Sequence, residues 1–202
     1  MSKRNNMKAL FKLGYGLYVV TSNDGSHDNA MISNTVFQVA ESPNRIVVTI
    51  NKNSYSHYVI SGTEKLNVNV LTENTPFDIF KSFGFKSGRD TDKFAGVTPK
   101  RSKNGLVVID EYINSYMSLS VENYLDLGTH GMFICTIDEA AVINDEPTMT
   151  YAYYQEHVKP KSNASKGWAC SVCGYIFEGE NIPDDFICPT CGHDATSFEL
   201  IE

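Results

Sequence analysis

Four cysteines in the last part of this 202-residue chain have the spacing of a metal site. They form two pairs, Cys170-x-x-Cys173 and Cys188-x-x-Cys191, with fourteen residues between the pairs. A two-residue gap lets two thiolates of one tight turn face a common point, and a glycine follows each pair to supply backbone freedom. Two such turns facing each other make a tetrahedral site of four sulfur ligands, which suits iron or zinc. The other interpretation, two disulfides of a secreted domain, fits this cysteine usage poorly.

The residues around the cysteines favour iron over zinc. Five aromatic side chains crowd a segment too short for a large core: Trp168, Tyr175, Phe177, Phe186 and Phe198. The segment resembles rubredoxin, and most closely the shorter form appended to rubrerythrins, through Trp-Ala-Cys-Ser-Val-Cys-Gly-Tyr and Cys-Pro-Thr-Cys-Gly. The resemblance implies one iron held by the four cysteines, with zinc as the alternative in recombinant material. His193-Asp194 replaces a lysine that is common in that family, which changes the expected docking surface.

The charge of this segment argues against a zinc ribbon that binds nucleic acid. After Lys166 the chain has seven acidic residues and no lysine or arginine, so its surface would repel phosphates. The segment also accounts for the whole net charge of −7, because seventeen bases balance seventeen acids in residues 1–167. Acidic residues confined to one module indicate a face that docks a protein partner.

The chain before the cysteines has the pattern of a mainly β domain. Apolar and alternating runs predict strands over residues 17–22, 29–39, 45–51, 65–71, 105–109, 116–126 and 132–143. Short helices are expected over residues 7–13, 53–60 and 76–83. Many short strands and frequent turns predict a closed or nearly closed β-barrel. Periodicity is lost at residue 155, so we expect a barrel domain over 1–154, a linker over 155–167 and a metal domain over 168–202.

Four polar segments of the first domain occur in the order found in the FMN-binding split-barrel flavin reductases, which include the flavoredoxins. These segments are residues 29–35, 51–56, 87–94 and 128–133. The resemblance implies a split β-barrel with a few short helices that binds FMN. It also implies the residues that would contact FMN: Asn29, Ser33, Asn34, Thr35, Lys52, Ser54, Ser56, Ser87, Lys93, His130 and Tyr154, with Tyr153 as the alternative to Tyr154.

The resemblance divides these residues by role. The first four would line the flavin ring and the ribityl chain, and Lys52, Ser54 and Ser56 would hold the phosphate, since hydroxyls and a helix N-terminus suit an anion. His130 is the candidate catalytic residue, although Thr129 stands where the family has aspartate. Each residue also has a structural interpretation, such as a polar strand face, a helix cap, a solvated loop or a structural histidine. Cys135 is expected to be a buried core thiol.

A flavin next to an iron site predicts electron transfer. A flavin accepts two electrons as a hydride, whereas such an iron site takes one electron at a time. The layout resembles the high-molecular-weight rubredoxins of anaerobic bacteria, which implies an NAD(P)H-dependent flavin/rubredoxin oxidoreductase, a homodimer, with a flavodiiron protein or similar acceptor. The absence of Gly-x-Gly-x-x-Gly after a strand argues against a separate dinucleotide site.

Two other functions remain open from the sequence. One is a non-enzymatic electron carrier reduced by a separate oxidoreductase, and the other is a zinc-stapled FMN-binding interaction protein.

We expect no nucleic-acid partner, because of the charge, and no membrane segment, because no apolar run has the length of a span. Cysteines used as metal ligands, without a signal peptide, predict a cytoplasmic protein.

Overall fold

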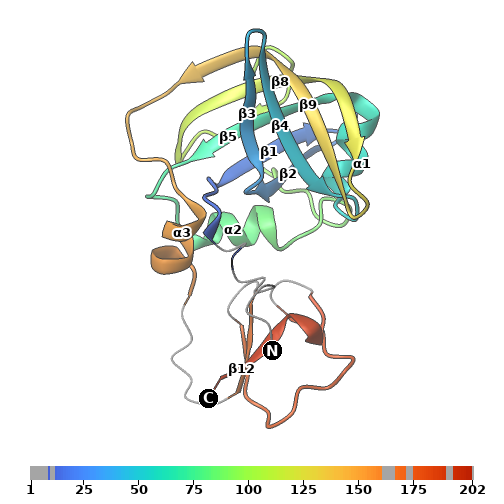
Figure 1. Cartoon of the computed structure of the whole chain (residues 1–202), viewed down its shortest axis with the longest axis vertical. Helices are drawn as coiled ribbons and strands as arrows, with labels where there is room; N and C mark the ends of the chain where they lie inside the picture. The colour runs from blue at the N-terminus through green and yellow to red at the C-terminus, as the bar shows by residue number, and fades with distance from the viewer. Residues whose placement is uncertain (1–8, 10–11, 161–166, 172–174, 190–192, 202) are drawn as a thin grey trace.

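The computed structural model describes residues 9, 12–160, 167–171, 175–189 and 193–201. A β-rich domain forms one body, and a smaller module lies beside its helices α2 and α3 (Figure 1). The elements of the larger body are β1 (Tyr18–Asn23), β2 (Asp28–Ser33), β3 (Val36–Glu41), β4 (Asn44–Asn51), α1 (Tyr55–Thr63), β5 (Lys65–Leu71), α2 (Phe77–Gly84), β6 (Lys100–Arg101), β7 (Val107–Val108), β8 (Ile113–Asp126), β9 (His130–Val142), α3 (Tyr151–Tyr153) and the π-helix η3 (Tyr154–Val158). The smaller module contains β10 (Gly167–Cys170), β11 (Ile176–Phe177), the 3-10 helix η4 (Ala195–Ser197) and β12 (Phe198–Ile201).

Seven strands form one antiparallel sheet in the order β2-β1-β5-β8-β9-β4-β3. The two edge strands, β2 and β3, are consecutive in the chain and are separated only by Asn34 and Thr35. One bent segment therefore serves both edges of the curled sheet, which gives a split β-barrel (Figure 1). The predicted single strand over residues 29–39 is wrong in this respect. Because β2 pairs with β1 and β3 pairs with β4, the segment must bend between them.

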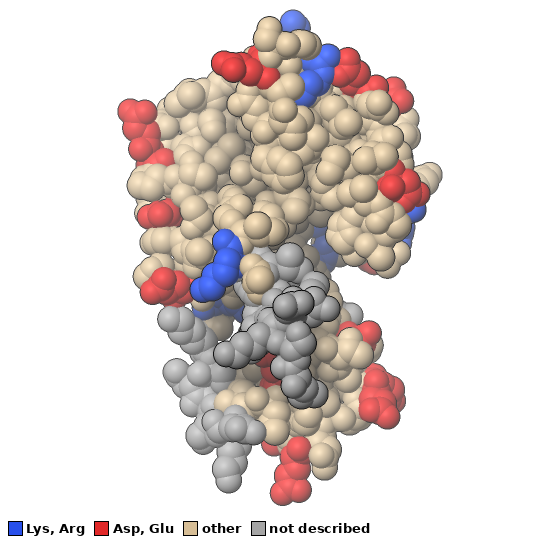
Figure 2. All heavy atoms as spheres, viewed as in Figure 1, with Lys and Arg blue, Asp and Glu red and all other residues tan. Residues whose placement is uncertain are grey.

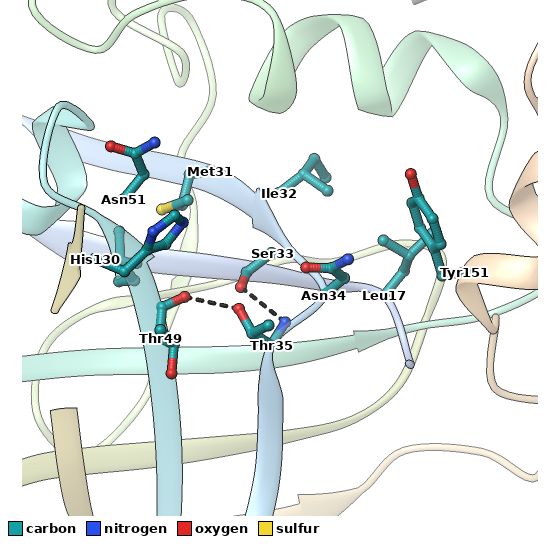
Figure 3. A pocket seen from close by; sticks show the side chains of 11 residues that line it. Leu17, Met31, Ile32, Ser33, Asn34, Thr35, Thr49, Asn51, His130 and Tyr151 are labelled. Carbon is teal, nitrogen blue, oxygen red and sulfur yellow. Dashed lines mark hydrogen bonds between the residues drawn. The ribbon is translucent and has the colours of Figure 1, made fainter. Parts of the chain in front are cut away.

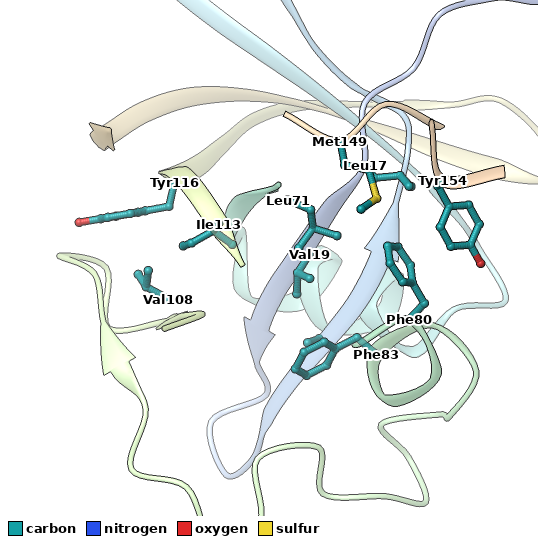
Figure 4. Packing of buried hydrophobic residues seen from close by; sticks show 11 residues of the cluster. Leu17, Val19, Leu71, Phe80, Phe83, Val108, Ile113, Tyr116, Met149 and Tyr154 are labelled. Atoms are coloured by element: carbon teal, nitrogen blue, oxygen red, sulfur yellow. The ribbon is translucent and has the colours of Figure 1, made fainter. Parts of the chain in front are cut away.

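Two buried clusters hold the barrel together. One lies among the central strands and includes Val48, Leu66 and Phe133, each at most 1% exposed. Cys135 belongs to this cluster, as predicted, and burial raises the pKa of its thiol to about 12, which makes it unreactive. The second cluster joins the sheet to the helices, and in it Phe80 of α2 packs with Met149 and its neighbours (Figure 4). It fixes α2 against the barrel.

Helix boundaries differ modestly from the sequence-based expectations. α1 and α2 each lie within three residues of the predicted ends. The predicted strand over 105–109 shortens to β7, which pairs with β6. The predicted helix over 7–13 lies mostly outside the described residues. Helical structure extends through Val158, so the first residues of the predicted linker are helical. Among the described residues, none of the helices has the length and apolar character needed to cross a bilayer.

The smaller module is built around its buried cysteines. Its three strands pair in the order β11-β10-β12. Cys170 and Cys188 are each 1% exposed, and Phe198 is 7% exposed. The ring of Phe186 packs against Phe198 and Phe177, with centroids 5.4 and 4.8 Å apart. Aromatic rings thus enclose a core that would be too small to be stable without additional constraints, such as those a bound metal would supply.

Candidate functional site

A cavity of about 210 Å³ opens where β2 gives way to β3 (Figure 3). Apolar and polar side chains both line it. The lining residues are Leu17, Met31, Ile32, Ser33, Asn34, Thr35, Thr49, Ile50, Asn51, His130 and Tyr151. Four of them, Ser33, Asn34, Thr35 and His130, are among the residues that the sequence predicted. An apolar lining with a few convergent polar groups is the usual character of a small-molecule site.

Hydrogen bonds at the bend between β2 and β3 set the shape of the polar part of the lining. The Thr35 hydroxyl donates to the Thr49 carbonyl oxygen at 2.7 Å, and the Thr49 amide donates to the Thr35 carbonyl oxygen at 3.0 Å. The Thr35 amide donates to the Ser33 hydroxyl oxygen at 3.4 Å. These bonds fix the side of the bend that faces β4. The Ser33 and Asn34 side chains therefore line the cavity from a constrained backbone.

His130 lines the cavity from the start of β9. In the antiparallel pair of β4 and β9, His130 lies opposite Asn51, which also lines the cavity. The Nδ1 atom of His130 lies 2.9 Å from the Thr129 hydroxyl oxygen. This contact involves one ring nitrogen, so the other can exchange a hydrogen bond with a ligand. Thr129, unlike aspartate, leaves the histidine without a neighbouring carboxylate at that position.

Three of the residues predicted to contact the phosphate have partners within the protein. The Lys52 ammonium donates to Asp126 at 2.8 Å on the surface. The Ser54 hydroxyl donates to the sulfur of Met31, a lining residue, at 3.7 Å. Ser56 is buried and accepts a hydrogen bond from the Asn29 side-chain amide at 2.7 Å. Asn29, Ser54 and Ser56 therefore form a layer that joins β2 to the start of α1, next to the cavity wall.

The structure does not bring Ser87 and Lys93 to this cavity. The Ser87 hydroxyl accepts the Arg89 amide at 3.2 Å. The Lys93 ammonium donates to the carbonyl oxygens of Ala30 and Phe83, at 2.6 and 3.0 Å, and burial lowers its pKa to about 8. Lys93 lines a second cavity of about 360 Å³. Its bonds tie the loop after α2 to β2.

The aromatic residue at the cavity is Tyr151, which the sequence analysis missed. Tyr154 is 5% exposed, and its ring packs on Phe80 with centroids 4.4 Å apart. The helix start decides which tyrosine faces the cavity. Thr150 caps α3 by accepting a hydrogen bond from the Tyr153 amide at 3.1 Å, and Tyr151 is the first helical residue. A threonine before three closely spaced tyrosines was the available signal for this start.

Matching backbone bonds shape the two cysteine turns of the smaller module. The Cys170 amide donates to the Tyr175 carbonyl oxygen at 2.8 Å, and the Cys188 amide donates to the His193 carbonyl oxygen at 2.7 Å. Each bond joins the first cysteine of a pair to the residue five positions later. Cys173 and Cys191 lie outside the described residues. Buried thiols within an aromatic shell fit an iron or zinc site of sulfur ligands.

Comparison with known proteins assigns both parts of the chain. Residues 10–162 match the flavin reductase like domain, and residues 168–199 match the rubredoxin-like domain of rubrerythrin. The chain therefore belongs to the flavin reductase-like family, and it carries a rubredoxin-like domain after the flavin domain. These two domains define an electron-transferring oxidoreductase whose cofactors are a flavin and iron.

Relatives and solved structures match the chain over different shares of its length. The chain is 34% identical to the high molecular weight rubredoxin of Moorella thermoacetica, covering 96% of this chain and 99% of that protein. It is 32% identical to the ferric-chelate reductase (NAD(P)H) of Archaeoglobus fulgidus, covering 78% and 93%. The solved structure of the NADH:FAD oxidoreductase SgcE6 of Streptomyces globisporus has a TM-score of 0.64 at 19% identity, covering 71% of this chain and 84% of that one, which shows the shared fold.

Proposed function

We propose that the protein oxidises NAD(P)H at an FMN held in the cavity between β2 and β3. Electrons then pass singly to an iron bound by Cys170, Cys173, Cys188 and Cys191, and onward to a partner protein. The observation that carries this proposal is a cavity lined by both apolar and polar side chains, in a flavin reductase-like barrel that continues into a rubredoxin-like module. When bound, the flavin supplies hydride acceptance and the return of its electrons one at a time.

The lining residues have complementary tasks in this proposal. Ser33, Asn34 and Thr35 offer hydrogen-bond partners to the polar edge of the ring, and Leu17, Ile32 and Ile50 pack against its apolar part. His130 would exchange a proton or hydrogen bond with the reacting molecule through its second ring nitrogen.

FMN is proposed because the polar part of the lining leads to the start of α1. Asn51 lines the cavity, and Ser54 precedes the first residue of this helix in an extended conformation. A helix N-terminus favours a phosphate, and Lys52 adds a nearby positive charge. To reach the phosphate, the Lys52 ammonium would have to leave or share its ion pair with Asp126.

The test is anaerobic mixing of the purified protein with NADH or NADPH, followed in the visible spectrum, together with metal analysis. We expect one iron per chain and loss of flavin absorbance before loss of the ferric iron absorbance. If neither nucleotide reduces the flavin, the protein is a carrier that needs a separate oxidoreductase. Zinc without iron in protein from iron-replete cells would favour the interaction protein instead.

The partner would dock on the acidic module, and we propose a flavodiiron protein or a similar acceptor. Asp184 and Asp185 are exposed and come shortly before Cys188 in the chain. Ile187, which lies between them and the cysteine in the sequence, is also exposed and offers the partner an apolar contact. Charged rims mainly raise association rates, and salt screens them, with a Debye length of ~10 Å at 0.1 M.

Replacing Asp184 and Asp185 with asparagine should therefore slow electron transfer to the acceptor at low salt. Added salt should slow the same step in the wild type, while flavin reduction by NAD(P)H changes less. Stopped-flow measurement of both steps across ionic strengths checks this. A transfer rate that ignores both salt and the double substitution would contradict the proposed docking face.

We further propose a cytoplasmic homodimer. The barrel exposes apolar side chains on its edge strand β3 and around the turn between β8 and β9: Phe37, Val39, Leu125 and Leu127, which are 46–53% exposed. Exposed apolar residues on an edge strand and at this turn suit contact with a second copy. Sedimentation equilibrium should show a dimer at micromolar concentrations with flavin bound, and a monomer would count against the proposal. Reduced cysteines as metal ligands support the cytoplasmic location.

A further inference from the structure

We propose that the C-terminal end of α2 is the docking surface for the cysteine module, with Phe85 as the positioning residue. The module would thereby be held beside the flavin cavity of its own barrel, and electrons would cross there. This inference rests on the proposed function for its electron-transfer consequence, whereas the docking contact stands on the structure alone.

Phe85 belongs to the barrel domain but packs in the core of the cysteine module. It is half-buried against the cluster that contains Cys170, Cys188 and Phe198. Its own ring lies edge-on to Phe77, with centroids 5.9 Å apart and planes at 61°. Its amide donates to the Lys81 carbonyl oxygen at 3.4 Å, which continues the hydrogen bonding of α2. The anchor is therefore held in position by a helix that is itself packed on the barrel.

The residue before the anchor touches the wall of the flavin cavity. A Cβ atom added to Gly84 would lie 3.3 Å from the Ile32 side chain, and Ile32 lines the cavity. Glycine lets the end of α2 approach β2 closely. Two consecutive residues, Gly84 and Phe85, thus contact the cavity wall on one side and the cysteine cluster on the other. The peptide bond between Gly84 and Phe85 therefore joins a packing contact at the cavity wall to a packing contact at the cysteine cluster.

Two further features favour the same docked position. The Lys159 ammonium, at the end of η3, donates to the carbonyl oxygen of Ser171, which follows Cys170. Residues 81–103 contain seven bases and two acids, and three of the bases (Lys81, Lys93 and Arg101) are bonded within the barrel, whereas the module contains seven acids and no base. Figure 2 shows acidic side chains on the module, with basic ones at the adjoining edge of the barrel. Complementary charge speeds docking and fixes its orientation.

Docking at α2 would make electron transfer from the flavin to the iron a reaction within one chain. With both groups bound, each crossing would take one electron from the reduced flavin and convert ferric iron to ferrous iron. The second electron would cross after the iron had given the first to the acceptor, and the protons of the reduced flavin would go to solvent. Because both sites belong to one docked unit, the crossing rate should not depend on protein concentration.

The test compares Phe85→Ala and Phe85→Leu with the wild type and with Tyr58→Ala. Tyr58 is a surface aromatic residue of α1, 68% exposed, and serves as the matched control. Loss of a half-buried aromatic contact should lower the docking constant about tenfold, whereas leucine preserves most of the apolar contact. Small-angle X-ray scattering should show a larger radius of gyration for Phe85→Ala, and stopped-flow should show slower flavin-to-iron transfer. Phe85→Leu and Tyr58→Ala should resemble the wild type in both.

The two readouts separate the possible failures. If Phe85→Ala keeps the wild-type radius and the wild-type transfer rate, Phe85 does not position the module. A wild-type transfer rate that rises with protein concentration would also overturn docking beside the chain's own cavity. If NAD(P)H does not reduce the wild-type flavin, the proposed function is wrong. In that case two measurements still decide whether Phe85 acts as proposed. One is the radius of gyration from scattering, and the other is the rate of flavin-to-iron transfer after photoreduction of the flavin.

Discussion

Replacement of Cys188 with serine is expected to abolish iron binding and to leave flavin binding unchanged. Cys188 is 1% exposed and begins a turn closed by the bond from its amide to the His193 carbonyl oxygen. A serine hydroxyl is not ionised at neutral pH and is a poor substitute for a thiolate ligand of iron. Because metal binding and folding are coupled in small metal domains, the loss should also unfold much of the module.

The flavin should remain because the barrel has its own buried clusters. The lining residues of the cavity come from the barrel and the helix that follows it, and none belongs to residues 167–201. Metal analysis and the visible spectrum measure iron, and protein-bound flavin is measured after gel filtration. Cys135→Ala is the matched control, since it removes a buried thiol of the barrel. It should keep the iron and lose stability through the cavity that it leaves. A parallel loss of flavin in Cys188→Ser would contradict the division into two modules.

The cysteine module was the part most open to prediction from sequence, because local spacing determines it. Two Cys-x-x-Cys turns need only a few neighbouring residues to form, and the structure closes both with equivalent backbone bonds. The prediction of a mainly β barrel was also confirmed, since alternation along each strand reflects which face is buried. Strand order, in contrast, depends on pairing between distant residues, and β5 between β1 and β8 was not predictable from periodicity.

The cavity between β2 and β3 was predictable only in part. Ser33, Asn34 and Thr35 were predicted together because they form one polar segment, but the bend that places them along the cavity arises from pairing with two different strands. The predicted flavin contact of Lys93 stays a prediction. Its ammonium is engaged by two carbonyl oxygens, a tertiary arrangement that has no local signal in the sequence.

Phe85 was missed for the same reason. In the sequence it follows a predicted helix as one aromatic residue among several. Only the placement of α2 beside the module makes it part of the cysteine cluster. The contact between Phe85 and the module also changes what is expected of the linker. A module tethered by a flexible segment would sample many positions, whereas Phe85 and the bond from Lys159 favour one of them.

A phenylalanine at position 33 is expected to block the proposed flavin site. Ser33 is 6% exposed, ends β2, and lines the cavity on the polar side (Figure 3). A large ring there would occupy space that the flavin needs. We expect an affinity for FMN about a hundredfold lower, which corresponds to ~2.7 kcal/mol of binding free energy. Fluorescence titration of the flavin-free protein with FMN measures it.

Ser33→Ala separates the volume of the side chain from its hydrogen bond. Alanine removes the acceptor for the Thr35 amide, a long bond of 3.4 Å, but leaves the cavity open. Its effect should stay below about tenfold, because one such bond contributes ~1 kcal/mol. Ser26→Phe, in the exposed turn between β1 and β2, controls for the added aromatic surface and should bind FMN as the wild type does. Iron content should be normal in all three variants, since the four cysteines that would bind iron all follow the barrel domain in the chain. If Ser33→Phe binds FMN as tightly as Ser33→Ala, the flavin does not occupy the cavity between β2 and β3, and the second cavity beside Lys93 becomes the site to examine.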